Sequence, residues 1–154
     1  MDVKHVNPFI ESFAMVMPQL GFSNVRKANL SAKGQEIVCS GVIIIVGIVG
    51  VIKGNVVYCM DTENAKKIAS TMMMGMPVTE LDEMSKSALS ELTNMLTATA
   101  ATNFSKIGIE IDISTPTLLY GKSISVKMSS KQVLSIQLLA DEMPIEVNIA
   151  FENR

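Results

Sequence analysis

The sequence has no tryptophan, a single histidine and only two cysteines among its 154 residues. Because His5 is alone and lies near the amino end, it cannot form a Ser–His or Cys–His nucleophile pair at the centre of a site. The sequence also lacks a Cys or His cluster for zinc, and its carboxylates are too dispersed for a calcium loop. We therefore expect no metal and no cofactor of the protein's own.

Strong charge and a membrane-spanning run are lacking as well. The formal net charge is −2 and no cluster of Lys and Arg is present, which argues against nucleic acid and anionic membranes as partners. The apolar run at 37–52 is shorter than the roughly 18–20 residues of a spanning helix. Met1 to Lys4 leads directly toward a helix start, with no signal peptide. These features predict a cytoplasmic protein.

The two cysteines, Cys39 and Cys59, both lie in apolar segments typical of strands. Disulfides are rare in cytoplasmic proteins. We therefore expect two reduced thiols, with a Cys39–Cys59 bridge as the alternative.

The length fits one domain, 1–154, and helix and strand patterns alternate along it. This order predicts an α+β fold in which an antiparallel or mixed sheet packs against long helices. Helices are predicted at 7–21, with Asn7 as N-cap, at 62–74 and at 81–108. Strands are predicted at 25–30, 37–49, 55–60, 109–113, 118–120, 123–128, 132–140 and 144–151.

The helix predicted at 81–108 is the longest element and carries no charged residue from Leu92 to Ser105. Because a solvated helix face normally carries Lys and Glu, we expect this helix to contact protein on more than one side. Ser87, Glu91 and Asn94 are spaced i, i+4 and i+7, which places them within about 60° of arc on one face. An arbitrary Glu-x-x-Asn pair is most often a polar shoulder on a packed helix.

The segment Ser-Ala-Leu-Ser-Glu-Leu-Thr-Asn at 87–94, followed by Thr115-Pro116, resembles the signature of the CheC/CheX phosphatases, and it is most similar to the CheX branch. The resemblance extends to Gly47, Gly50 and Gly54, to the methionine-rich segment 72–76, and to Leu81-Asp82-Glu83. It implies a pseudo-twofold CheC/CheX-like fold and hydrolysis of the aspartyl phosphate of a CheY-like response regulator. It also implies a homodimer.

By this resemblance, Asn94 positions the attacking water and Glu91 pairs with a lysine of the regulator. Ser87 fills the first position of the motif, where it would orient Glu91 or cap the contact surface, and Pro116 shapes the loop beside the helix. The Mg²⁺ ion is expected to come from the phosphorylated regulator. The alternative is a binding or scaffold module that uses the same helix face without turnover.

A partial internal repeat is also present. Segments 51–60 and 142–151 resemble each other, and each is predicted to be the return strand of a hairpin. In the first predicted helix, Asn7, Glu11 and Ala14 have the spacing of Ser87, Glu91 and Asn94, with alanine in place of the amide. The glycines from Gly47 to Gly54 lie inside a predicted hairpin, so we interpret them as sites of close backbone packing and not as a phosphate loop.

Overall fold

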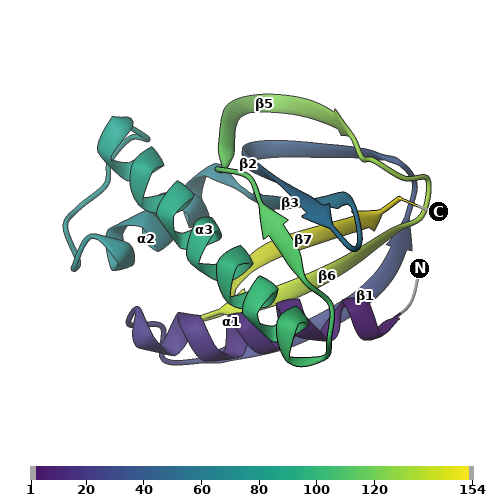
Figure 1. Cartoon of the computed structure of the whole chain (residues 1–154). Helices are drawn as coiled ribbons and strands as arrows, with labels where there is room; N and C mark the ends of the chain where they lie inside the picture. Colours follow the sequence, from purple (N-terminus) through teal and green to yellow (C-terminus); the bar gives the residue numbers. More distant parts are fainter. Residues whose placement is uncertain (1–2, 153–154) are drawn as a thin grey trace.

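A computed structural model describes residues 3–152, in which helices gather on one side of a curved sheet (Figure 1). The helical elements are a 3₁₀ turn at Val3–His5, α1 at Asn7–Gln19, α2 at Thr62–Met72 and α3 at Glu83–Lys106. The strands are β1 at Val25–Lys33, β2 at Glu36–Gly50, β3 at Gly54–Met60, β4 at Ile111–Ile113, β5 at Thr117–Lys127, β6 at Val133–Ala140 and β7 at Met143–Phe151.

The sheet runs in the order β1-β6-β7-β3-β2-β4, and β5 also pairs with β2. Every pairing within the described residues is antiparallel. This arrangement confirms the predicted α+β class and settles the sheet as antiparallel.

The sheet order confirms the predicted pseudo-twofold relation between the halves. β3 and β7 pair with each other at the centre, and each also pairs with the other strand of its own hairpin, β2 or β6. Outside these hairpins the halves exchange strands, because β1 pairs with β6 and β5 pairs with β2. In this scheme α1 corresponds to α3, β1 to β5, β2 to β6 and β3 to β7.

Helix α3 packs on the sheet and against both α1 and α2, which explains its long uncharged stretch. Its apolar face is buried in the main core through Leu89, Leu92, Leu96, Ala100 and Phe104. Its buried polar groups are paired as well, as expected for groups removed from water.

Three hydrogen bonds hold α3 to its neighbours. The Ser12 hydroxyl of α1 donates to the carbonyl of Leu96, and Asn103 Nδ2 donates to the carbonyl of Pro8 at 3.0 Å. The Tyr58 hydroxyl of β3 is 2.8 Å from Thr97 Oγ1. Burial raises the pKa of Tyr58, so this phenol stays neutral at physiological pH. α3 is therefore a fixed support for the residues on its exposed face.

The expectation of two reduced cysteines is wrong, because Cys39 and Cys59 form a disulfide with their Cα atoms 6.1 Å apart. The ladder between β2 and β3 ends at Val42, and Gly41 has a φ of +131°, so β2 changes direction there. This bend brings Cys39 to Cys59 within a second, smaller apolar cluster that also contains Ile37 and Ile43. The sequence showed two strands but not the bend that joins these positions.

Several predicted boundaries also differ. Asn7 is not an N-cap: α1 begins at Asn7 after Val6, with no capping side chain, and Pro8 supplies the favoured early proline. The strands predicted at 118–120 and 123–128 are one strand, β5, with a register shift where Gly41 and Cys39 pair with Gly121 and Ile124. Lys122 and Ser123 of β5 therefore lie opposite Ser40 of β2 in a bulge, and the strand continues through it.

The prediction for the hairpin glycines is confirmed. A Cβ atom at Gly54 would collide with the carbonyl oxygen of Ala150 on the neighbouring strand β7. At Gly50 the φ is +124° and a Cβ atom would lie 2.8 Å from the carbonyl oxygen of Glu110. Among residues 3–152, no helix is both long enough and apolar enough to cross a membrane.

Candidate functional site

The site is built on the amino-terminal half of α3, whose start is fixed by Asp82. The Asp82 side chain accepts a hydrogen bond from the backbone N–H of Ser85 at 2.9 Å, and this bond holds the pKa of Asp82 below its usual value. The helix therefore begins at Glu83, two residues later than predicted. It ends at Lys106, and Gly108 follows with a φ of +83°, as the predicted stop requires.

Ser87, Glu91 and Asn94 lie on the exposed side of α3, with Ser87 and Glu91 exposed and Asn94 half-buried. Within residues 3–152, neither Glu91 nor Asn94 has a hydrogen-bond or ion-pair partner for its side chain. Ser87 makes no hydrogen bond to Glu91 in this structure, so it does not orient that carboxylate here. The carboxylate and the amide are both available to a ligand.

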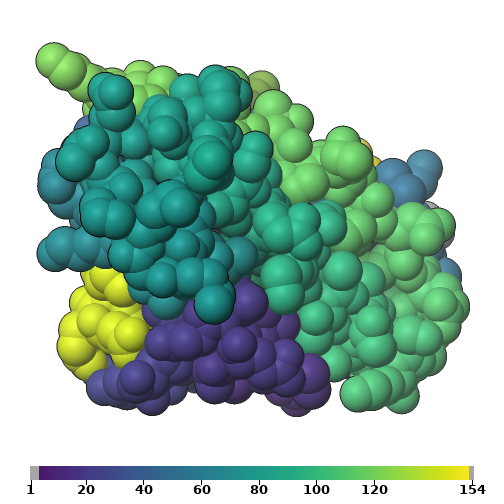
Figure 2. Space-filling view, turned by 90° about the vertical axis from the view of Figure 1, so that its left-hand side faces the viewer, coloured from purple at the N-terminus to yellow at the C-terminus, as the bar shows by residue number. Residues whose placement is uncertain are grey.

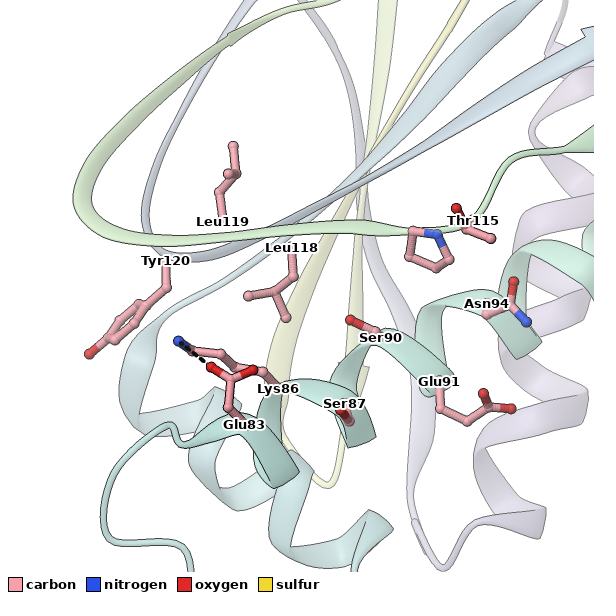
Figure 3. A pocket seen from close by; sticks show the side chains of 11 residues that line it. Glu83, Lys86, Ser87, Ser90, Glu91, Asn94, Thr115, Leu118, Leu119 and Tyr120 are labelled. Atoms are coloured by element: carbon pink, nitrogen blue, oxygen red, sulfur yellow. Dashed lines mark ion pairs between the residues drawn. The ribbon is translucent and has the colours of Figure 1, made fainter.

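A second wall faces this helix. The segment Thr115–Tyr120, which leads into and begins β5, lies across from α3, and the two enclose a groove of about 690 Å³ (Figure 3). Its lining residues are Glu83, Lys86, Ser87, Ser90, Glu91, Asn94, Thr115, Pro116, Leu118, Leu119 and Tyr120. The four predicted site residues therefore line the same groove: Ser87, Glu91, Asn94 and Pro116. In Figure 2, teal α3 residues lie against the green residues that follow them in the chain.

The loop before β5 is held in place by the sheet. Gly47 of β2 donates its backbone N–H to the Ser114 hydroxyl at 2.8 Å, and the Ser114 N–H donates to the carbonyl of Gly47 at 3.0 Å. These two bonds fix the backbone just before Thr115 and Pro116. The position of the predicted motif proline beside α3 follows from this anchor.

The groove has two different ends (Figure 3). Asn94, Glu91 and Thr115 lie toward one end, and Glu83, Lys86 and Tyr120 lie toward the other. At the second end, Lys86 Nζ is 3.9 Å from Glu83 Oε1 and 5.9 Å from the centre of the Tyr120 ring. We refer to these as the amide end and the lysine end of the groove.

Sequence reasoning missed the lysine end entirely. Lys86, Ser90 and Asn94 are spaced i, i+4 and i+8, so the helix pattern alone contained a signal for Lys86. Leu118, Leu119 and Tyr120 belong to the opposite wall, and no local pattern links them to α3. These three residues lie opposite α3 only because β5 pairs with β2.

The chemistry available in the groove is that of a carboxylate, an amide, hydroxyls and one ammonium group. Among residues 3–152, no group of three or more His, Cys, Asp or Glu side chains is arranged to hold a metal ion. An amide fixed on a helix can hold a water molecule by accepting and donating hydrogen bonds. An exposed carboxylate beside it can pair with a cation of a docked molecule.

Comparison with known proteins places this geometry in a family. Residues 42–139 match the family described as chemotaxis phosphatase CheX. The CheY-P phosphatase CheX of Thermotoga maritima is 33% identical over 128 residues, which are 82% of each chain.

Solved structures agree with this match. The chemotaxis protein CheX of Desulfovibrio desulfuricans superimposes with a TM-score of 0.86 at 19% identity, covering 97% of this chain and 99% of that one. The CheX chain of a CheX–CheY–BeF₃–Mg²⁺ complex from Borrelia burgdorferi gives a TM-score of 0.81 at 25% identity, covering 99% of this chain and 100% of that one. The chain therefore belongs to the CheX family of chemotaxis phosphatases.

Proposed function

We propose that this protein hydrolyses the aspartyl phosphate of a CheY-like response regulator. The observation that carries the proposal is the side-by-side placement of Glu91 and Asn94 in a groove on α3 of a CheX-family chain, where neither side chain has a partner among residues 3–152. The Thermotoga relative is named a CheY-P phosphatase, and the Borrelia relative was solved with CheY, BeF₃ and Mg²⁺.

Asn94 has the catalytic role in this mechanism. Its amide hydrogen-bonds a water molecule and holds it in line with the phosphorus of the acyl phosphate. The oxygen of the water bonds to phosphorus, the bond from phosphorus to the aspartate oxygen breaks, and the regulator regains its carboxylate as inorganic phosphate leaves. Asn94 is half-buried on a helix held by buried contacts, so little freedom is lost when the water is positioned.

Glu91 has the docking role. Its exposed carboxylate pairs with a lysine of the regulator and fixes the orientation of the bound complex. Ser87, one turn earlier, caps the contact surface, and Pro116 shapes the opposite wall beside Asn94.

The Mg²⁺ ion belongs to the regulator in this proposal. An acyl phosphate is already activated, and the cation neutralises charge on the phosphoryl oxygens. The phosphatase then has to contribute only position and hydrogen bonds, which the amide of Asn94 can provide. We further place the reaction in the cytoplasm, where a phosphorelay of this kind operates.

The alternative is a module that binds the regulator without turnover, and the exposed Met74, Met76 and Met84 near the start of α3 suit adaptable contacts. The two functions separate in one experiment. A CheY-like regulator from the same organism is phosphorylated in Mg²⁺, and phosphate release is followed with and without this protein. We expect catalytic amounts to accelerate release; a stoichiometric complex with unchanged release would favour the binding module.

We also propose that the protein is a homodimer, as the family resemblance implies. The two edges of the sheet, β1 and the β4–β5 side, leave backbone groups available for pairing between copies. Sedimentation at micromolar concentration measures this directly, and a monomer mass alone would contradict it.

A further inference from the structure

The lysine end of the groove has no role in the mechanism above. We infer that Lys86 and Tyr120 form a second docking contact, in which the Lys86 ammonium pairs with a carboxylate of the bound regulator; this inference rests on the proposed function. The contact determines which regulator is accepted, and it does not take part in the chemical step.

Distance along the helix excludes a catalytic role for Lys86. Lys86 precedes Asn94 by eight residues, which corresponds to about 12 Å of helix at a rise of about 1.5 Å per residue. A phosphoryl group held at Asn94 is therefore out of reach of the ammonium. A docked protein, in contrast, covers about 800 Å² of its partner, so both ends of the groove lie within one contact surface.

The Lys86 ammonium is oriented but not neutralised by its own chain. Its Nζ atom is 3.9 Å from a Glu83 side chain that is 97% exposed, an arrangement that contributes little in water. The Lys86 Nζ atom also lies over the Tyr120 ring, 5.9 Å from its centre, and this cation–π contact restrains the Lys86 side chain. The Lys86 side chain is only 31% exposed, so much of its stem is already packed in the groove before a partner binds.

The wall beside Lys86 supplies apolar surface next to the charge. Tyr120 is 48% exposed and Leu119 is 41% exposed, both on β5. Tyrosine is one of the residues that most often dominate binding energy at protein interfaces. A partner that packs against this wall would exclude water from the Lys86 ammonium. The ammonium would then pair more strongly with an acidic group of the partner.

The charges along the groove favour a protein partner with the opposite arrangement. Among the lining residues that the structure describes, Lys86 is the one cation; the exposed Glu83 lies beside it, and Glu91 lies toward the other end. The Glu91–lysine pair orients a docked regulator at one end of the groove. A second pair of opposite sign at the other end reinforces this orientation, and it rejects regulators with a cation at the position facing Lys86.

The test measures binding and turnover separately. A CheY-like regulator loaded with BeF₃ and Mg²⁺, in which BeF₃ stands in for the phosphoryl group, gives Kd, and the phosphorylated regulator gives KM and kcat. For Lys86→Met, which keeps the length of the stem, we expect Kd and KM to rise about tenfold while kcat stays within about twofold. Lys86→Glu should raise Kd about a hundredfold, and Tyr120→Ala should raise it about tenfold.

Lys66→Met is the matched control. Lys66 forms the same type of i, i+3 pair, with Glu63 at 3.2 Å, but it lies on α2 outside the groove, so its loss should leave Kd, KM and kcat unchanged. Melting temperatures show that the variants are folded. A Lys86→Met variant with native Kd and KM at low salt would overturn this inference alone. A native protein that neither binds nor dephosphorylates the regulator would overturn the proposed function as well.

Discussion

Helices α1 and α3 occupy matching places in the two halves of the fold, and they carry the same polar spacing with one difference. Asn7, Glu11 and Ala14 of α1 are all exposed, as Ser87 and Glu91 of α3 are, but Ala14 stands where α3 has Asn94. The two helices therefore share the carboxylate and differ in the group to which we assign the chemistry. Helix α1 therefore provides an internal control for the site residues of α3.

The connections that follow the two helices differ as well. Only residues 20–24 join α1 to β1, whereas residues 107–116 join α3 to β5 and include β4. The longer connection is bonded to Gly47 of β2 through Ser114, and it carries Thr115 and Pro116 to the groove. Thr115 and Pro116 therefore come from an insertion that the first half lacks, whereas Leu118, Leu119 and Tyr120 belong to β5, the counterpart of β1. We expect a functional site to need both the helix face and this connection.

The largest expected effect concerns a bond that only the first half has. The Cys39–Cys59 disulfide ties β2 to β3 across 20 residues, while the corresponding hairpin of β6 and β7 contains no cysteine. Loop-closure entropy predicts that the double variant Cys39→Ala/Cys59→Ala loses about 3 kcal/mol of unfolding free energy. Urea denaturation measures this loss, and the wild type in reductant should approach the variant. Equal stability with and without the bond would show that packing alone holds this bend.

The next prediction concerns the glutamate that both helices carry, Glu91 on α3 and Glu11 on α1. Glu91→Ala should raise KM and lower kcat, each about tenfold, because a charge pair made on docking is lost before the chemical step. The matched control is Glu11→Ala on α1, which should leave both constants unchanged. Loss of activity in the Glu11 variant would mean that the first half also docks a regulator.

A smaller effect concerns the helix starts. α3 has a side-chain cap in Asp82, whereas α1 follows Val6 without one. Asp82→Ala should lower the melting temperature by about 3 °C at neutral pH. Because hydrogen bonding lowers the pKa of folded Asp82, its contribution is present above the unfolded pKa and is lost as the pH falls through the folded value. The melting difference should therefore vanish in strong acid; a difference that persists there would indicate a packing role.

For a substitution on α1 we expect no change in phosphatase activity. Ala14→Asn completes the polar triad on α1, yet it should add no phosphatase activity, since α1 lacks the inserted segment that carries Thr115 and Pro116. A phosphate-release assay of Ala14→Asn in an Asn94→Ala background makes any gain visible. Restored activity would show that the helix face alone suffices.

The sequence predicted what local periodicity encodes. The polar triad on one face of α3 and the strand pairs β2–β3 and β6–β7 follow from residue spacing, and the structure agrees with them. The end of α3 was also predictable, because Gly108 adopts the positive φ that a helix stop favours.

The rest depends on contacts between distant segments. The disulfide requires the bend at Gly41, and the continuity of β5 through Gly121 requires its ladder with β2. Tyr120 reaches the groove only because that ladder places β5 across α3. Lys86 is the exception, since its helical spacing from Asn94 is visible in the sequence alone. Long-range strand pairing is the physical information that a single sequence did not supply.

The variant Asn94→Ala shows whether Asn94 acts on the reaction and not on binding. Single-turnover dephosphorylation is measured with the variant in excess over a phosphorylated CheY-like regulator, and Kd is measured with the BeF₃–Mg²⁺ form. We expect a rate about 10²-fold lower with Kd within about twofold of the wild type, because the positioned water contributes mainly in the transition state. A native rate in this variant would rule out a catalytic role for Asn94 and leave the groove as a binding site only.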